Sequence, residues 1–265
     1  MFLGRLLTKA GAILAHPGSH ALALHRQNCN ICRRPSVFLR DSVEDPWIRR
    51  CLWCRSTPKY RAIQFTAEQH MKGTLDELLN NGGRIYEAST TSPIHRRYRG
   101  RSNYVSSGFF FDKPFGVEVR PGVWNEDVQQ LSFVDASFDV VISSETMEHV
   151  RRPWLGFREI QRVLKPGGIH VFTIPYRDDR LTTARVDTSG EENVYLLPKV
   201  YHQDPYRTED SLVYTDFGRD LPELLSATGF ATGLERVLDP RHDIQDDLRP
   251  VSVLLSVKSQ VPVTP

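Results

Sequence analysis

All four cysteines of the chain lie in one short segment, as two Cys-x-x-Cys pairs. The first pair is Cys29 and Cys32, the second is Cys51 and Cys54, and 18 residues separate the pairs. Each pair can place two thiolates on one side of a tetrahedral zinc ion, so two pairs complete a closed four-sulfur site. Because no ligand position stays open, such a metal is structural. Its binding energy, on the order of 10 kcal/mol, stabilises the fold.

A disulfide framework is the main alternative for these cysteines, followed by free thiols. Disulfides require an oxidising compartment, and the N-terminal segment 1–24 is a poor export signal because its apolar pieces are short and Lys9 interrupts them. We therefore favour zinc and a cytoplasmic location. The glycine that usually follows the second cysteine of a zinc knuckle is replaced by Arg33 and Arg55. This predicts slightly strained turns with outward-pointing arginines.

A strand, a helix and a second strand can be read from the centre of the chain. Residues 138–143, FDVVIS, form an apolar run rich in β-branched residues, which is typical of a parallel strand covered on both faces. The segment 153–164 is predicted to be a helix with one apolar side, formed by Leu155, Ile160, Val163 and Leu164. KPGG then ends the helix, and IHVFTIP is the next buried strand. The pattern predicts a right-handed βαβ crossover in a doubly wound sheet.

Four elements of this region resemble the class I S-adenosylmethionine-dependent methyltransferases, in particular the type 11 group. They are EDVQQLSF, the D-x-S-F-D-V-V approach to the strand, MEHV after it, and LKPGG before the next strand. The resemblance extends more loosely over residues 75–257, and to a subset with an N-terminal cysteine-pair module and a downstream YHxDP segment, here YHQDP. It implies an α/β fold: a Rossmann-like, doubly wound, seven-stranded methyltransferase sheet with a small N-terminal zinc-binding module. We expect residues 1–70 to form an N-terminal helix and a zinc-ribbon-like module, and 71–265 the methyltransferase domain.

The resemblance also implies where S-adenosylmethionine binds. In the family the first strand ends in an acidic residue and a glycine-rich loop, whereas here Glu87 is followed by Ala88 and Ser89 without glycines. Small side chains permit part of the close approach that glycine allows. The cofactor carries no phosphates that would need an anion-cradling loop. We expect an altered loop that still binds the cofactor, with a retired site as the alternative.

Further cofactor contacts are implied after the later strands. Ser106 stands at the ribose position, which is acidic in the family, so one hydroxyl replaces a bidentate carboxylate. Asp127 aligns with the residue that accepts a hydrogen bond from the adenine amine, and Val128 packs on the ring. A solvated loop aspartate is the alternative for Asp127. Ser143, in the fourth strand, completes the implied set.

Candidate catalytic residues follow the fourth strand and lie in a long insertion. Methyl transfer is an in-line displacement, so the enzyme mainly aligns donor and acceptor, with a base where the nucleophile carries a proton. Glu145 and His149 are four residues apart and would share a helix face. His149 titrates near neutrality and is a candidate base, with a scaffold role as the alternative.

The 38-residue connection 177–214 is unusually long for a link between a strand and a helix, which indicates a lid over the acceptor. His202 and Tyr201 are candidates for proton transfer and substrate contact within it, and Tyr214 for substrate contact. Aromatic packing beneath the insertion is the alternative.

The whole chain has 265 residues, 40% hydrophobic and 25% charged, enough for one α/β core and an appendage. Its net charge of +2 hides an asymmetry: residues 1–110 hold 17 Lys and Arg against 7 Asp and Glu, and 111–265 hold 17 against 25. The basic half suggests an anionic partner, with solvated arginines as the alternative. No apolar run reaches the roughly 18 residues of a membrane span. Residues 2–15 are expected to form an amphipathic helix that docks on its own domain or contacts a membrane surface.

The leading hypothesis is therefore a methyltransferase that transfers a methyl group from S-adenosylmethionine to an O, N or C atom of a small-molecule or glycan-type acceptor, such as a nucleotide sugar. An RNA methyltransferase that uses the basic zinc module is one alternative. A catalytically retired binding protein that retains the fold is the other.

Overall fold

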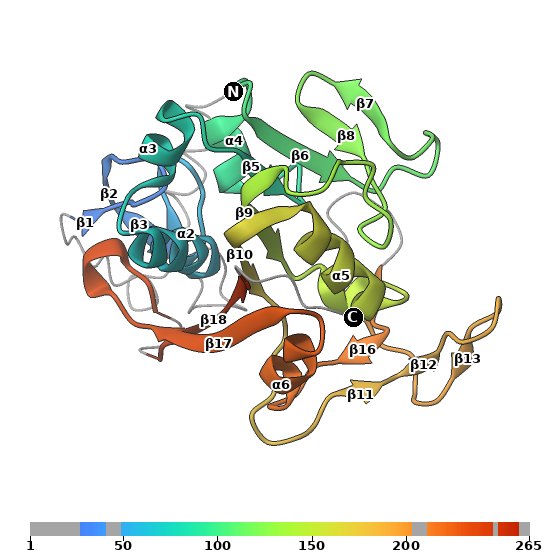
Figure 1. The fold of residues 1–265 in the computed structure, drawn as a ribbon. Helices are drawn as coiled ribbons and strands as arrows, with labels where there is room; N and C mark the ends of the chain where they lie inside the picture. Colours follow the sequence, from blue (N-terminus) through green and yellow to red (C-terminus); the bar gives the residue numbers. More distant parts are fainter. Residues whose placement is uncertain (1–26, 41–48, 203–210, 246–248, 260–265) are drawn as a thin grey trace.

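A mixed eight-stranded sheet forms the centre of the protein (Figure 1). The structure is a computed structural model that describes residues 27–40, 49–202, 211–245 and 249–259. In spatial order the strands are β17 (Phe230–Val237), β18 (Val251–Lys258), β10 (Leu164–Thr173), β9 (Phe138–Ser144), β5 (Ile85–Glu87), β6 (Tyr104–Gly108), β8 (Val123–Asn125) and β7 (Val117–Arg120). Neighbours from β10 to β8 are parallel, whereas β18 and β7 run antiparallel to theirs. The chain leaves β5 toward β6 and returns to β9 on its other side, which creates a topological switch point.

This strand order confirms the predicted doubly wound methyltransferase sheet, with one addition. The resemblance implied seven strands, and the sheet contains them as β8, β6, β5, β9, β10, β18 and β17. The eighth strand, β7, is joined to β8 by a turn through Pro121 and Gly122, where Gly122 has φ 72°. A Pro-Gly sequence favours such a turn because glycine adopts positive φ without strain. The predicted sheet therefore gains a hairpin at one edge.

Helices cover both faces of the sheet because alternate residues of each strand point to opposite sides. The buried side chains of Val140 and Ile142 belong to one apolar core, and that of Val141 to the other. The helices of the first core are α2 (Pro58–Met71), α3 (Leu75–Asn80) and α4 (Pro93–Tyr98), and those of the second are α5 (Pro153–Val163) and α6 (Leu221–Ser226). No helix in the described parts of the chain is long and apolar enough to cross a lipid bilayer.

The predicted apolar side of α5 is confirmed at Ile160 and Val163, which are fully buried. Leu155 is only half-buried, however, and Phe157 takes its place in the core. Phe157 lies three residues before Ile160, and at that spacing two helical residues share one face.

The LKPGG segment lies inside a strand, although it was expected only to end a helix. α5 ends at Val163, and β10 begins at once with Leu164, which pairs with Phe138. Pairing breaks off over KPGG and resumes at Ile169. Gly167 has φ 77° in this interruption, so the segment forms an irregularity that offsets the register of β10 against β9.

The cysteine segment packs against the same core as α2. Its short strands are β1 (Gln27–Asn28), β2 (Pro35–Ser36), β3 (Phe38–Arg40) and β4 (Arg49–Cys51). Ile31 and Phe38 share a core with the sheet residues Val140 and Ile142. The predicted domain boundary at residue 70 coincides with the end of α2, yet α2 itself packs on β9, β10 and β18. The division into two domains stays a prediction, and the expected helix 2–15 lies outside the described residues.

Short antiparallel pairs of strands build the insertion 177–214 and the segment that follows it. They are β11 (Thr183–Ala184) with β16 (Thr215–Asp216), β12 (Val186–Asp187) with β13 (Val194–Tyr195), and β14 (Tyr201–His202) with β15 (Ser211–Leu212). The β12–β13 hairpin projects away from the sheet at the lower right of Figure 1. The returning segment after β15 comes back to the edge of the sheet where the candidate site lies.

Candidate functional site

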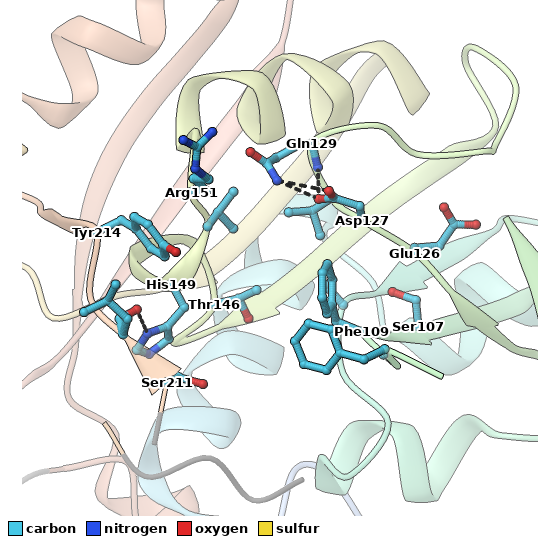
Figure 2. Close-up of a pocket in the computed structure, with 16 residues that line it drawn as sticks. Ser107, Phe109, Glu126, Asp127, Gln129, Thr146, His149, Arg151, Ser211 and Tyr214 are labelled. Atoms are coloured by element: carbon cyan, nitrogen blue, oxygen red, sulfur yellow. Dashed lines mark hydrogen bonds between the residues drawn. The ribbon is translucent and has the colours of Figure 1, made fainter. Parts of the chain in front are cut away.

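A cavity of about 550 Å³ lies at the carboxyl ends of the parallel strands. Its walls are formed by the segments that follow β5, β6, β8 and β9, and by residues 211–214 of the insertion. Figure 2 shows Phe109 and Asp127 on one side of this space, and His149 and Tyr214 on the other. Open α/β sheets bind ligands at this edge, beside the switch point, and the volume is typical of small-molecule sites.

The wall after β8 is acidic and carries the predicted adenine contacts Asp127 and Val128. Asp127 Oδ1 accepts a hydrogen bond from the Gln129 amide at 2.9 Å, and both carboxylate oxygens accept from its side-chain nitrogen at 3.0 Å. Next to it, burial raises the pKa of Glu126, which the Ser132 amide and hydroxyl partly offset. Two neighbouring carboxyl groups suit a ligand that carries positive charge.

The loop after β5 contains no glycine, and its backbone needs none. None of residues 88–92 has a positive φ. The loop ends where the Ser92 hydroxyl caps α4 by accepting a hydrogen bond from the His95 amide at 2.8 Å. Ala88 lines the cavity, whereas Ser89 does not. The missing glycines therefore cause no backbone strain at the cavity wall.

Glu87 lies at the end of β5, outside the cavity lining. Its side chain is 1% exposed. It accepts a hydrogen bond from the Tyr104 hydroxyl, and its Oε1 has no hydrogen-bond partner within the described ranges. Burial raises the pKa of Glu87 to about 7, and hydrogen bonds from Ser92 and Tyr104 lower it in part. A buried carboxyl group that titrates near neutrality therefore lies directly before the loop.

Two serines with predicted cofactor roles point into the protein interior. The Ser106 hydroxyl donates to the Gly122 carbonyl at 3.2 Å. Ser143 is buried and hydrogen-bonds with His170 Nε2 at 2.9 Å. Ser107, which the sequence analysis missed, lines the cavity instead of Ser106. Neighbouring strand residues face opposite sides of the sheet, which is why Ser107 lines the cavity and Ser106 does not.

The segment after β9 is a 3₁₀ turn, η1 (Met147–His149), and not a longer helix. His149 lines the cavity. Glu145 precedes the turn with φ 49°, does not line the cavity, and forms an ion pair with Lys59 at 3.1 Å. The prediction that Glu145 and His149 share a helix face is therefore wrong, because the helical turn is too short to include both residues.

The same turn buries Glu148, which the sequence analysis did not consider although it lies in the quoted MEHV motif. Its Oε1 is 3.6 Å from His149 Nε2 and 3.9 Å from His202 Nδ1. Burial and, secondly, the charge of Glu145 raise the pKa of Glu148 to about 8. The structure thus brings the two predicted histidines together around one buried carboxyl group.

The insertion forms one wall of the cavity by packing on the turn after β9. The Tyr214 amide donates to the Glu148 carbonyl at 2.8 Å. Arg151, which also lines the cavity, donates from Nε to the Asn193 side chain at 2.9 Å. Tyr214 is part of the lining, whereas Tyr201 and His202 are not. Of the predicted site residues, the cavity therefore collects Ala88, Asp127, Val128, His149 and Tyr214.

The thiols of the four cysteines form one cluster. Their sulfur atoms are within 4.8 Å of one another, with Cys29 Sγ 3.6 Å from Cys54 Sγ and Cys32 Sγ 3.8 Å from Cys51 Sγ. A tetrahedral zinc site with bonds of about 2.3 Å has sulfur–sulfur separations of about 3.8 Å. Disulfide sulfurs would be about 2.05 Å apart. The four thiols are free, and their arrangement fits a metal ion.

Both cysteine pairs end in the turn expected of a metal knuckle. Arg33 has φ 58° and Arg55 has φ 60°, the region that glycine would occupy without strain. Their amides donate to the carbonyls of Cys29 and Cys51 at 2.8 and 3.0 Å. Arg33 is exposed as predicted, whereas Arg55 is half-buried.

Two contacts, one made by an arginine and one by a lysine, join the cysteine segment and the start of α2 to the cavity loops. Arg96 in α4 donates to the carbonyl of Cys54 at 2.9 Å and also to the carbonyl of Thr91 in the loop after β5. Lys59, at the start of α2, pairs with Glu145 after β9. The cysteine segment and the start of α2 therefore contact both loops through residues that do not line the cavity.

Part of this site lies in a segment that is similar to known methyltransferases. Residues 112–172 match the type 11 methyltransferase family, described as a methyltransferase domain. Uncharacterized methyltransferases from three strains of Mycobacterium tuberculosis are 44% identical over 55 residues, which is 20% of this chain and 22% of theirs. The chain thus matches about a fifth of the length of these relatives.

Solved structures show a weaker likeness. An S-adenosylmethionine-dependent methyltransferase from Mesorhizobium loti has a TM-score of 0.42 and 18% identity, over 68% of this chain and 95% of that one. A Haloferax volcanii complex that contains the Trm112 methyltransferase activator has a TM-score of 0.45 and 16% identity, over 71% and 90%. The fold class rests on the strand order rather than on these likenesses.

The strand order and the cavity at the switch point define the class of protein, an α/β methyltransferase fold. Within that class, the match over residues 112–172 confirms the predicted resemblance to the type 11 methyltransferases. This segment contributes the cavity residues from Glu126 to Arg151.

Proposed function

We propose that this protein is an S-adenosylmethionine-dependent methyltransferase. One observation carries the proposal: the segment that matches the methyltransferase domain supplies two walls of the cavity, and Asp127 and Val128 lie together in one of them. When bound, S-adenosylmethionine supplies an electrophilic methyl group on a sulfonium. The residues of the chain bind, orient and shield the two reactants.

The fit to the cofactor rests on the chemistry of the cavity wall. Asp127 accepts from the adenine amine in addition to Gln129, and Val128 and Ala88 offer apolar contact. Phe109 adds an aromatic surface. The carboxyl groups of Glu126 and Asp127 favour a cationic ligand. Glu87, Ser89, Ser106 and Ser143 stay predictions as cofactor contacts, since none lines the cavity.

We further propose a small-molecule or glycan-type acceptor, in agreement with the sequence analysis. Tyr214 and Arg151 lie on the insertion side of the cavity and provide ring stacking and hydrogen bonds. An RNA acceptor is less favoured, because arginines of the basic half are used internally: Arg33 pairs with Glu68, and Arg97 with Asp76 at 2.8 Å.

The metal of the cysteine site is proposed to be zinc, held by Cys29, Cys32, Cys51 and Cys54 without an open position. Its role is structural, since the site supports the loops from outside the cavity. Four free thiols at metal spacing agree with a reducing compartment, so a cytoplasmic location belongs to the proposal.

Calorimetric titration of the zinc-loaded protein with S-adenosylmethionine and S-adenosylhomocysteine tests this function. We expect micromolar binding of both, which would justify an acceptor screen that begins with sugars and nucleotide sugars. Binding of neither would identify a retired methyltransferase fold. Salt-dependent RNA binding by the same protein would instead favour the RNA alternative.

A further inference from the structure

Glu148 is a buried carboxyl group that the proposed cofactor site does not use. Its side chain is 1% exposed, and neither carboxylate oxygen has a hydrogen-bond partner among the described residues. Buried polar groups almost always have a partner, because water can no longer compensate them. Glu148 lies directly before His149, which lines the cavity. The missing partner of Glu148 is therefore expected at the cavity.

The contact of His149 Nδ1 with a backbone carbonyl determines which ring nitrogen of His149 carries the lone pair. Its Nδ1 lies 2.9 Å from the Leu212 carbonyl oxygen. A carbonyl can only accept, so Nδ1 carries the hydrogen and Nε2 of the neutral ring keeps its lone pair. Histidines that bind metals are typically held in this way by a backbone carbonyl. Nε2 is also the atom that lies 3.6 Å from Glu148 Oε1.

His202 completes the cluster from the insertion. Its Nδ1 is 3.9 Å from Glu148 Oε1, and its ring is nearly perpendicular to that of His149, with 5.0 Å between the centroids. One ligand atom from each of the three residues lies within 4.8 Å of the others. Ligands of a tetrahedral ion with bonds of about 2.1 Å are about 3.4 Å apart. A small contraction therefore suffices to form a site.

We propose that Glu148, His149 and His202 bind a divalent cation at the acceptor side of the cavity. One carboxylate oxygen and two imidazole nitrogens suit Zn²⁺, Co²⁺ or Mn²⁺. The cation gives the buried carboxylate its missing partner. Three protein ligands leave at least one position for a ligand from the cavity. This site is separate from the four-cysteine site, which has no open position.

The cation identifies the acceptor as an oxygen nucleophile, a role that rests on the proposed methyltransferase function. A bound cation lowers the pKa of a coordinated hydroxyl. The acceptor hydroxyl releases its proton to water, and its oxygen takes the methyl group. A C–O bond forms, the C–S bond of the cofactor breaks, and the electron pair of that bond stays on sulfur.

The full chain is loaded with one equivalent of Zn²⁺, which the four thiolates take up, and is then titrated with Co²⁺; visible absorption tests the site. The four-cysteine site keeps its zinc, because zinc binds a given site more tightly than cobalt does. We expect one equivalent of Co²⁺ to bind with the weak bands of oxygen and nitrogen ligands and without thiolate charge-transfer absorption. Absence of Co²⁺ binding to the wild-type protein would overturn the proposal.

Variants assign the binding to these residues. Glu148→Gln and His202→Ala should each lower the Co²⁺ affinity at least tenfold, whereas Glu223→Gln and His70→Ala, both exposed, should bind like the wild type. If Glu148→Gln fails to fold, His202→Ala decides, because His202 is partly exposed on β14. Unchanged affinity in His202→Ala would reject the site.

The cofactor titration separates this inference from the proposed function. Binding of S-adenosylmethionine without Co²⁺ binding would reject only the cation site. Binding of Co²⁺ without S-adenosylmethionine would reject the methyltransferase and leave the cation site.

Discussion

Three carboxyl groups in and near the cavity have contrasting surroundings. Asp127 faces the cavity and is held by Gln129, whereas Glu87 and Glu148 are buried with incomplete hydrogen bonding. Burial disfavours the charged form of both glutamates, so their pKa values rise. Asp127 can therefore contact a ligand, whereas Glu87 responds to pH and Glu148 requires a partner for its carboxylate oxygens.

Asp127→Ala should weaken S-adenosylmethionine binding about tenfold or more, since a hydrogen bond to a charged group contributes about 1.5–3 kcal/mol. Calorimetry measures the change in dissociation constant. Asp135→Ala is the matched control, because Asp135 is 78% exposed and contacts Arg162 away from the cavity. Equal effects of the two substitutions would mean that the adenine position lies elsewhere.

Glu87→Gln should alter how stability depends on pH. The pKa of Glu87 is raised to about 7 in the folded protein from an ordinary value of 4.5, so the folded state holds more protons between these pH values. The contribution of Glu87 to the free energy of unfolding therefore falls by about 3 kcal/mol in total as the pH rises through that window. At higher pH it stays at the lower value. Urea unfolding at pH 5 and pH 8 should show that the variant gains stability relative to the wild type at the higher pH. Parallel pH profiles would contradict a buried, titrating Glu87.

Among the elements, the insertion is the part that the sequence described least well. Its length and tyrosines predicted a lid, but its short strands pair with one another and with β16, and its end contacts the turn η1 after β9. Just after the insertion, Gly218 lies against the backbone near the start of the insertion: an added Cβ would be 2.3 Å from the Arg180 oxygen and 2.4 Å from the Leu181 carbonyl carbon. This close approach anchors the two ends of the insertion together.

Gly218→Ala should destabilise the protein by about 1–3 kcal/mol, because backbone atoms have to move to admit the methyl group. Urea unfolding measures the loss, and limited proteolysis locates it in the insertion. Gly190→Ala, within the insertion, is the control, since an added Cβ there meets nothing within 4 Å. Similar unfolding curves for the two variants would rule out a tight anchor at Gly218.

Across the whole molecule, a buried arginine connects segments that are far apart in the chain. Arg61 in α2 is fully buried, bonds to the carbonyl of Ser56 beside the cysteines, and pairs with Asp243 at 3.0 Å, 182 residues away. Its guanidinium also lies 4.3 Å above the ring of Phe38. Burial lowers the pKa of Arg61 to about 10, while Asp243 and the cysteines favour its charge. The cysteine segment and the C-terminal part of the sheet are thus stabilised together.

Zinc removal should therefore affect the whole protein. Metal analysis should find about one zinc per chain, and a chelator should lower Tm strongly, given a binding energy on the order of 10 kcal/mol. It should also weaken S-adenosylmethionine binding through the contacts of Arg96 and Lys59. Arg96→Ala should weaken cofactor binding while it keeps the zinc. A protein purified without zinc and indifferent to chelators would end the proposed zinc site.

The sequence by itself determined strand β9, helix α5, the buried part of strand β10 and the pairing of cysteines at metal spacing. These features depend on local properties: apolar runs, Pro and Gly positions, and short distances between ligands along the chain. The resemblance carried by EDVQQLSF and LKPGG was sufficient to predict the sheet and to select Asp127 and Val128, which line the cavity.

Only the tertiary structure decided which side chains meet. It selected Ser107 over Ser106, tied Glu145 to Lys59, and gathered Glu148 with His149 and His202. Such contacts depend on the face that each strand residue takes and on the return of a distant segment. Neither is encoded in the local pattern, because packing of the whole chain sets both.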